Sequence, residues 1–249
     1  MLLVVDTADS RRWNGALQDI SVVDDVTDVL LVASPGAFLE GHIVRADGRP
    51  LPFDLSDLDI SLQHRHPTSA TLGAGRADVR ADGTFAVQSG AGTMHLEIAG
   101  LPAPWHLKVA TLNGVDVTDR AFELGEGSGH RLEITLTNRV VRLLGDVTDR
   151  SARPVSNALV VLFPEDRARW HASRLIRTTF SHRQGRYELG DLPAGDYRVA
   201  AVATLPRRAW MDPAVLDRLW RSSAPVRLQE DQQHAVSLKV VAPPSDLIQ

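Results

Sequence analysis

The chain has 249 residues, of which 43% are hydrophobic and 23% are charged, as in folded soluble proteins. Its net charge of −4 argues against a basic surface of the kind that binds nucleic acid or anionic lipid. It contains no cysteine, which excludes disulfides, thiol catalysis and cysteine-ligated zinc. It also has no run of about 18 apolar residues, so we expect no membrane-spanning helix.

Residues 1–36 resemble the end of a repeat whose complete copies follow. Asn14-Gly15 is matched by Asn113-Gly114, and Asp25-Val26-Thr27-Asp28 by Asp116-Val117-Thr118-Asp119. We therefore expect residues 1–36 to be the C-terminal strands of a truncated preceding repeat, and the chain to be a fragment of a longer protein. Because two sandwich strands alone are marginally stable in water, they either pack on the first full repeat or pair with sequence upstream.

Residues 37–138 are expected to fold as an antiparallel β-sandwich. Tight turns are predicted at Asp82-Gly83 and Asn113-Gly114. Apolar and polar residues alternate, as in half-buried strands, over residues 41–45, 59–63, 94–98 and 131–136. About seven short strands in roughly 100 residues are typical of such a sandwich.

Residues 139–242 repeat this pattern with two departures. Residues 158–163 are continuously apolar, so we expect a strand that is buried on both faces. Residues 212–220 predict a short helix, with Asp212 as its N-cap and Pro213 at its first position. One face of this helix is apolar, formed by Val215, Leu216, Leu219 and Trp220. We expect the helix to lie across one end or edge of the second sandwich.

The two segments echo each other at a nearly constant offset of about 103 residues. Gly41 is matched by Gly145, Gly83 by Gly185, and Gly92 by Gly195. A constant offset indicates tandem duplication of one domain. The predicted fold is therefore all-β, with tandem antiparallel β-sandwiches of Ig-like or prealbumin-like type and one short helix in the second domain. The expected parts are the truncated repeat at 1–36, the sandwiches at 37–138 and 139–242, and a tail at 243–249.

Several turn motifs of the second repeat occur in a characteristic order. They are Gly145-x-Val147-x-Asp149, Arg153-Pro154-Val155, Gln184-Gly185-Arg186-Tyr187 and Leu192-Pro193-Ala194-Gly195-Asp196-Tyr197. This order resembles the carboxypeptidase regulatory-like domain, most specifically in its last motif. The resemblance covers most of residues 140–241 and, more weakly, 37–138. It implies a transthyretin-like or carbohydrate-binding-like β-sandwich that is not itself a peptidase and that accompanies other domains in exported bacterial proteins.

The tryptophans of the second repeat are the leading candidates for ligand binding. An exposed tryptophan can stack on a sugar ring while nearby polar groups bind hydroxyls. The candidate residues are Trp170, Trp210 and Trp220, with Arg167, Arg169 and Asp166 beside the first of them. The competing interpretation is structural: Trp220 fastens the helix to the sandwich and Trp210 covers its loop, because amphipathic helices bury their aromatic residues.

We expect no metal, no cofactor and no catalytic site. His64-Arg65-His66 places two imidazoles two residues apart, but a zinc site needs three or four protein ligands, so we interpret this segment as a loop. The chain has neither a Gly-x-Ser-x-Gly elbow nor a phosphate-binding loop. Its lysines, Lys108 and Lys239, occupy non-matching strand positions, which argues against an isopeptide crosslink.

These observations favour a non-catalytic structural or interaction module of a larger exported bacterial protein, whose partners are the other domains of that protein. One alternative is a carbohydrate-binding module that binds polysaccharide through the tryptophans. A second alternative is an accessory domain of an enzyme or transporter encoded upstream. An extracellular or periplasmic location follows from the resemblance alone, because Met1-Leu2-Leu3-Val4-Val5-Asp6 lacks the features of a signal peptide.

Overall fold

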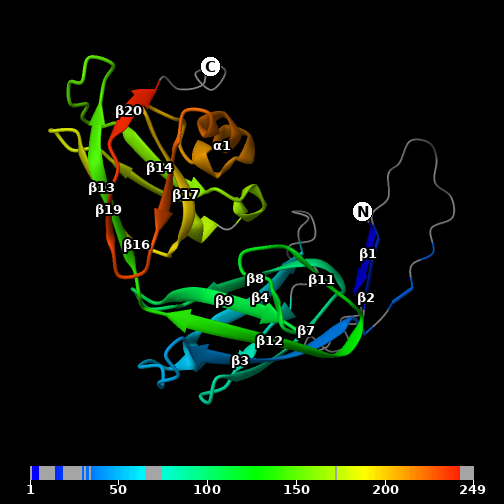
Figure 1. Cartoon of the computed structure of the whole chain (residues 1–249). Helices are drawn as coiled ribbons and strands as arrows, with labels where there is room; N and C mark the ends of the chain where they lie inside the picture. The colour runs from blue at the N-terminus through cyan, green and yellow to red at the C-terminus, as the bar shows by residue number, and fades with distance from the viewer. Residues whose placement is uncertain are drawn as a thin grey trace. The chain divides into compact units, whose positions relative to one another are not determined.

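The computed structural model describes residues 2–5, 15–18, 30, 32–33, 35–64, 75–171 and 173–241. The chain divides into two compact units, Met1–Thr137 and Asn138–Gln249, and the described part of each is built from β-sheets (Figure 1). The predicted all-β class with a single short α-helix is confirmed. In the described part of the chain, no helix is long and apolar enough to cross a membrane.

Most of the segment predicted as a truncated repeat, and the tail at 243–249, lie outside the described residues. Within residues 1–36, the strands β1 (Leu2–Val5) and β2 (Gly15–Gln18) form an antiparallel pair. The origin of residues 1–36 in a preceding repeat therefore stays a prediction.

The first unit contains two sheets that enclose one core. The six-stranded sheet has the order β10 (Val115–Asp116), β9 (His106–Leu112), β12 (Gly127–Thr137), β3 (Ala37–Arg45), β7 (Thr84–Ser89), β6 (Asp78–Val79). The four-stranded sheet has the order β11 (Phe122–Leu124), β8 (Gly92–Ala99), β4 (Asp59–His64), β5 (Gly75–Arg76). The 3₁₀ turn η1 (Leu55–Asp57) precedes β4. Strands β12 and β3 are parallel, and the other pairs are antiparallel.

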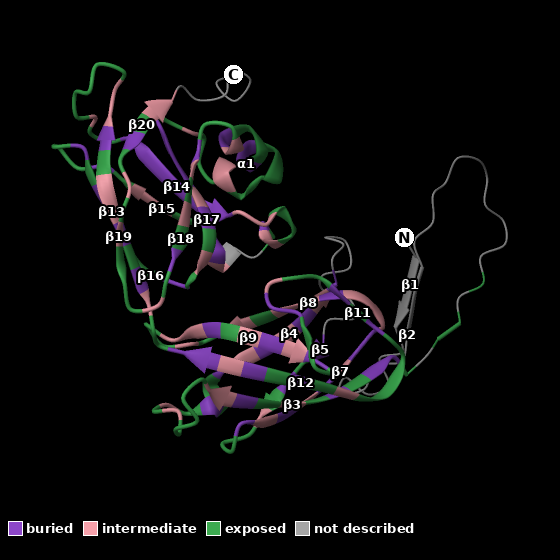
Figure 2. Cartoon of the chain, in the orientation of Figure 1, coloured by how far each residue is buried: buried purple, intermediate pink, exposed green. Residues whose placement is uncertain are grey.

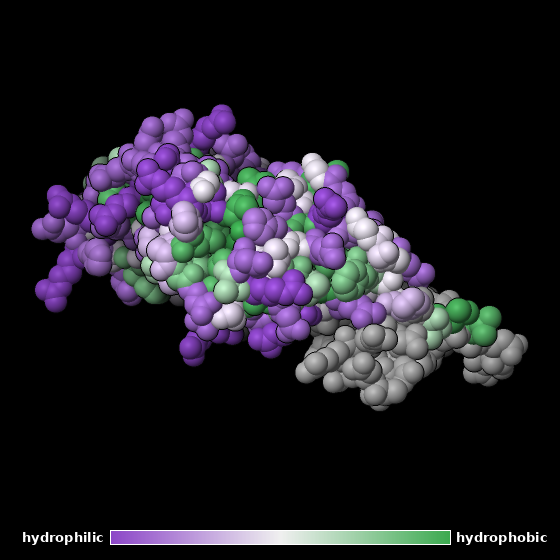
Figure 3. Space-filling view, turned by 90° about the horizontal axis from the view of Figure 1, so that it is seen from below, coloured by the Kyte–Doolittle hydropathy of each residue, from purple (hydrophilic) through white to green (hydrophobic). Residues whose placement is uncertain are grey.

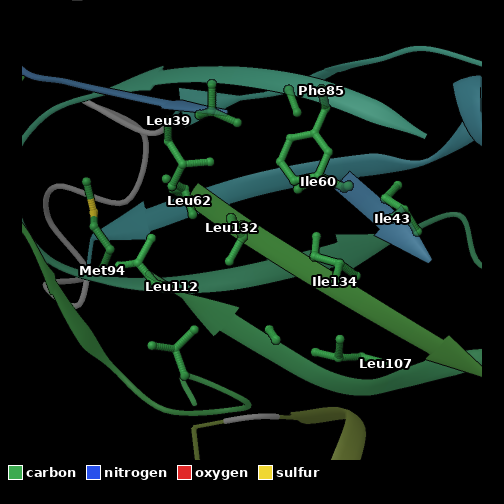
Figure 4. Packing of buried hydrophobic residues seen from close by; sticks show 14 of the residues in the cluster. Leu39, Ile43, Ile60, Leu62, Phe85, Met94, Leu107, Leu112, Leu132 and Ile134 are labelled. Atoms are coloured by element: carbon green, nitrogen blue, oxygen red, sulfur yellow. The ribbon is translucent and has the colours of Figure 1, made fainter. Parts of the chain in front are cut away.

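Alternate residues of these strands point between the two sheets. Ile60 and Leu62 of β4 are fully buried against Leu132 and Ile134 of β12 in one cluster, and Figure 4 shows these side chains converging from both sheets. Phe85 of β7 is 2% exposed. The period of two in the sequence therefore places the core where half-buried strands require it.

The second unit also contains two layers, which share one strand. One layer consists of β15 (Arg177–Phe180), β14 (Leu159–Pro164), β17 (Gly195–Val202) and β18 (Ala224–Leu228). The other consists of β16 (Arg186–Leu192), β13 (Val141–Thr148) and β19 (Gln233–Ala235). Strand β20 (Leu238–Val241) pairs in parallel with both β13 and β17, and so joins the layers. The connections hold the 3₁₀ turns η2 (Arg167–Arg169), η3 (Ser173–Leu175) and η4 (Ala209–Met211) and the helix α1 (Pro213–Trp220).

The two units share the same core pairings. Strand β4 pairs with β8 as β14 pairs with β17, and β3 pairs with β7 as β13 pairs with β16. The parallel pair of β12 and β3 corresponds to that of β19 and β13. The units differ in the connection that follows β8 or β17: between β8 and β11 the first unit has the hairpin of β9 and β10, whereas between β17 and β18 the second has η4 and α1.

Helix α1 covers the outer face of the sheet that contains β14 and β17, and not an end or edge of the sandwich as predicted. Leu159, Val161 and Phe163 form a buried cluster with the helix residues Val215, Leu216 and Leu219. All six residues of β14 are buried (Figure 2), which confirms the prediction of a strand buried on both faces. The matching outer positions of β4 in the first unit are polar: Asp59, Ser61 and Gln63.

A glycine faces an aromatic ring at the same place in both units. Gly41 pairs with Phe85, and Gly145 pairs with Tyr187. A Cβ atom on Gly41 would overlap the Phe85 ring, and one on Gly145 would overlap the carbonyl oxygen of Val236. These glycines are needed for close approach, because a side chain has no room there.

The second unit has a strand break where the first unit has none. Between β19 and β20 the carbonyl oxygen of Val236 accepts a hydrogen bond from the Tyr187 hydroxyl at 2.8 Å. In the first unit, β12 pairs without interruption from His130 to Leu136 along β3, and Phe85 has no hydroxyl to donate. The tyrosine hydroxyl therefore supplies a donor to a partly buried carbonyl at the strand break of the second unit.

Candidate functional site

The tryptophans predicted to bind sugar lie in and beside a hydrophobic cluster of the second unit. Trp170 follows η2, is 6% exposed, and donates its indole N–H to the carbonyl of Pro164 at 2.9 Å. Its ring packs edge-on against Phe163 at a centroid separation of 5.9 Å. Trp170 therefore has no free ring face for a sugar.

Trp220 is the last residue of α1, and two arginines contact its ring. The guanidinium carbon of Arg198 lies 4.3 Å from the ring centroid, and that of Arg167 lies 4.8 Å away. Such cation–π contacts are attractive and occupy the area that a stacked sugar would need. A sugar could reach this ring only after one of these arginines had moved.

Both arginines are fixed by further polar contacts. The Arg198 side chain donates to the hydroxyl and the carbonyl of Ser223 at 2.7 and 2.9 Å, and Nη1 lies 3.2 Å from Glu165. The Arg167 guanidinium lies 2.6 Å from the Asp217 carboxylate on α1. These contacts join η2, β17 and α1, so the geometry corresponds to the structural interpretation of Trp220.

The remaining predicted residues do not complete a sugar site. Trp210 lies in η4, is partly buried, and packs against the same hydrophobic cluster as α1. Asp166 is the N-cap of η2, where its carboxylate accepts from the N–H of Ala168 at 3.0 Å. Arg169 is half-buried at the end of η2. Sugar binding by these residues thus stays a prediction without a preformed platform.

The histidine pair is only partly described, because Arg65 and His66 lie outside the described residues. His64 points into the core of the first unit and is 5% exposed, and its Nε2 atom has no hydrogen-bond partner among the described residues. Burial, with a smaller contribution from the nearby His95, lowers the pKa of His64 below its ordinary value. The described residues contain no cluster of three or more groups that could ligate a metal.

A groove on the outer face of the six-stranded sheet is lined by polar side chains from several elements. It has a volume of about 540 Å³ and is lined from β3, β9 and β12. The charged or polar side chains in its lining are those of Glu40, His42, Thr111, Asn113, Arg131 and Glu133. Sequence analysis did not single out these residues.

Strand pairing arranges these side chains in two rows across the groove. Parallel pairing places Glu40 beside Arg131 and His42 beside Glu133. Antiparallel pairing places Thr111 on the other side of Glu133. Residues directly opposite each other on neighbouring strands have Cβ atoms about 5 Å apart, so each row is a compact set of polar groups.

The turn between β9 and β10 forms one wall of the groove and is tied to β12. Asn113 and Gly114 have φ values of 50° and 81°, as a tight two-residue hairpin turn requires. The amide oxygen of Asn113 accepts from the N–H of Arg131 at 2.8 Å, and the N–H of Asn113 donates to the Arg131 carbonyl at 2.8 Å. The wall is therefore fixed relative to the backbone of β12 at Arg131.

No family model matches the chain, and no curated protein matches it. Among solved structures, the Bacillus anthracis TIE protein aligns with 96% of this chain and 41% of its own, at 12% identity and a TM-score of 0.29. The minor pilin of Streptococcus agalactiae aligns over 84% and 98%, at 12% identity and a TM-score of 0.38. A streptococcal ancillary pilin aligns over 92% and 75%, at 10% identity and a TM-score of 0.36. This chain thus spans less than half of the first of these proteins. At such TM-scores the alignments carry no argument about function.

Proposed function

We propose that this chain is a non-catalytic structural or interaction module whose two β-sandwich units present surfaces to other domains or proteins. The main support is that the carboxylates whose pKa is lowered lie in turns. Asp82 accepts from the hydroxyl and the N–H of Thr84 at 2.6 and 2.9 Å, and these bonds lower its pKa. Backbone N–H groups likewise lower the pKa of Asp54 and Asp149. These carboxylates stabilise turns, which is the chemistry of a scaffold.

We further propose that the units at 37–138 and 139–242 are copies of one carboxypeptidase regulatory-like module. The Leu192-Pro193-Ala194-Gly195-Asp196-Tyr197 run leads into β17, with Leu192 and Tyr197 buried in the core. Gly195 has a φ of 154° and lies against the Tyr197 ring, so a Cβ atom there would be crowded. These contacts support the proposal by giving the motif a structural role.

The proposed location is extracellular or periplasmic, and the proposed partners are other domains of a longer protein. Both proposals can be tested by crosslinking an epitope-tagged form of the protein in intact source cells. We expect a membrane-impermeant amine-reactive crosslinker to label it before lysis and to join it to a discrete envelope partner. If the protein is labelled only after lysis, the proposed location is wrong. If the chain turns over any member of a panel of peptides, esters and glycosides, and a groove substitution abolishes that turnover, the proposed absence of catalysis is wrong.

A further inference from the structure

The charged side chains of the groove in the first unit are not used by the fold. Within the described residues, the side chains of Glu40, Arg131 and Glu133 make no hydrogen bond and no ion pair, although Arg131 lies opposite Glu40. Some surface arginines elsewhere in the described residues do pair, as Arg76 does with Asp59 at 2.8 Å. The groove therefore offers one guanidinium and two carboxylates that are free to bind a ligand.

The second unit shows that the shared fold does not require these charges. The shared pairing register places Leu144 and Ala235 where the first unit has Glu40 and Arg131. The residue that corresponds to Glu133 is Ser237, which precedes β20. In the described part of the second unit, no strand takes the place of β9, which supplies Thr111 and leads into the turn that supplies Asn113. The polar groove is thus an addition specific to the first unit.

We propose that this groove binds a short zwitterionic peptide, of dipeptide size, with its carboxylate on Arg131 and its ammonium group on Glu133, while Glu40 is left to bind an additional basic side chain of the ligand. Arginine binds a carboxylate through two parallel hydrogen bonds, and such charge-assisted bonds are the strong ones. Asn113 also lines the groove. Its amide oxygen accepts from the Arg131 N–H, so its amide nitrogen is the group left to donate to the carboxylate.

The spacing of the two charges suits this ligand. Arg131 and Glu133 are two residues apart on β12, so their side chains share one face at a separation of about 7 Å. A fully extended dipeptide spans about 7 Å. The volume of about 540 Å³ also falls within the range of small-ligand sites. Because the groove has two carboxylates and one guanidinium, a dipeptide with an additional basic side chain is favoured over an uncharged one.

The test is a titration of the ¹⁵N-labelled full chain with lysylglycine and with glycylglycine, followed by amide NMR. We expect saturable shifts confined to residues 40–42, 111–114 and 131–133. The groove is open to solvent, so the expected Kd for lysylglycine is on the order of millimolar, and weaker for glycylglycine. Arg131→Gln and Glu133→Gln should each raise the Kd by about fivefold or more, because each removes a charge-assisted contact.

Two controls separate this binding from general effects. Arg183→Gln, at an exposed turn position of the second unit, should leave the Kd unchanged. N-acetylglycinamide, which has neither end charge, should produce no saturable shift. The proposal is overturned if the shifts do not saturate, if N-acetylglycinamide binds as well as lysylglycine, or if Arg131→Gln and Glu133→Gln bind normally while their spectra elsewhere match the unsubstituted chain.

Discussion

At the scale of single residues, close packing of glycine against an aromatic ring links the two units and also distinguishes them. The neighbour of Gly41 is a side chain, that of Phe85, which can be shortened. The nearest neighbour of Gly145 is the Val236 carbonyl, which belongs to the backbone and cannot be removed. The two equivalent glycines should therefore differ in whether a second substitution nearby can make room for a side chain.

This difference predicts the outcome of two double substitutions. Gly41→Ala should lower the free energy of unfolding by about 2 kcal/mol through overpacking. Adding Phe85→Leu should restore part of this loss, because the ring that the new Cβ meets is gone. Adding Tyr187→Leu to Gly145→Ala should restore none. Urea unfolding of the four single variants, the two double variants and the unsubstituted chain, analysed as two double-mutant cycles, measures both coupling energies. Equal coupling in the two cycles would contradict the backbone contact at Gly145.

The tyrosine hydroxyl gives a second prediction at this scale. Tyr187→Phe should destabilise the second unit by about 1–2 kcal/mol, because the Val236 carbonyl loses its buried donor. The matched substitution Phe85→Tyr should not stabilise the first unit, since β12 has no strand break that frees a carbonyl for it. Thermal unfolding of both variants compares them, and a stabilising Phe85→Tyr would show that a buried acceptor is free there.

At the scale of elements, the sequence predicted the type of each segment better than its position. The alternation of residues 59–63 and the continuous apolar run at 158–163 identified a strand with one buried face and a strand with two. The helix was also predicted correctly, from the Asp212 N-cap onward, but its place was wrong. Amphipathicity shows which face of a helix is buried and not the surface that covers it.

The groove could not be predicted from the sequence for a related reason. Charged residues at alternating exposed positions look like an ordinary solvated strand face. Only the pairing of β3 with β12 brings Glu40 beside Arg131, across about 90 residues of sequence, and long-range pairing is not contained in a local pattern. The available signal was the comparison of the two repeats, in which these charged positions are not shared.

Helix α1 offers a prediction with a matched control. Asp212→Ala should cost about 1 kcal/mol of stability, because the carboxylate accepts from the N–H of Ala214 at 2.8 Å at the start of the helix. Asp217→Ala removes an equal charge from the same helix but breaks only an exposed ion pair with Arg167, so its cost should be about 0.5 kcal/mol or less. Denaturant midpoints compare the two variants, and equal losses would contradict the capping role.

At the scale of the whole molecule, each unit has its own core, and their surfaces are not dominated by one kind of residue. On the face shown in Figure 3, hydrophobic residues occur in patches among hydrophilic ones. The two core clusters that line the sandwiches belong to separate units. The buried titratable groups are also distributed unequally, with His64 in the first unit and Tyr187 in the second.

This distribution predicts opposite pH limits for the two units. The pKa of His64 is lowered, so the folded first unit resists protonation and loses stability as the pH falls below the ordinary value of 6.5. The pKa of Tyr187 is raised, so the second unit loses stability as the pH rises above the ordinary value of 10.0. The measurement is pulsed hydrogen exchange, in which samples are first equilibrated at pH 5 or pH 10.5 and all are then labelled at one common pH. First-unit amides should be less protected after equilibration at pH 5, and second-unit amides after equilibration at pH 10.5.

A His64→Leu variant should remove the loss of first-unit protection between pH 6.5 and 5, whereas the Asp82 and Asp149 turns keep their carboxylates ionised in that window because their pKa values lie below 3.8. If both units open together at each pH, the unequal distribution of buried groups does not control their stability.

The exchange of the β9–β10 hairpin for η4 and α1 has a consequence for evolution and for protein engineering. Both inserts start after the strand pair that ends with β8 or β17, and both return to β11 or β18 in the same register. The pairings on either side remain intact, so this connection can accept elements of different secondary structure if the covered face changes its polarity to match. A new element can be grafted at this place only if it also replaces the buried residues that β9 supplies to the first unit or α1 to the second.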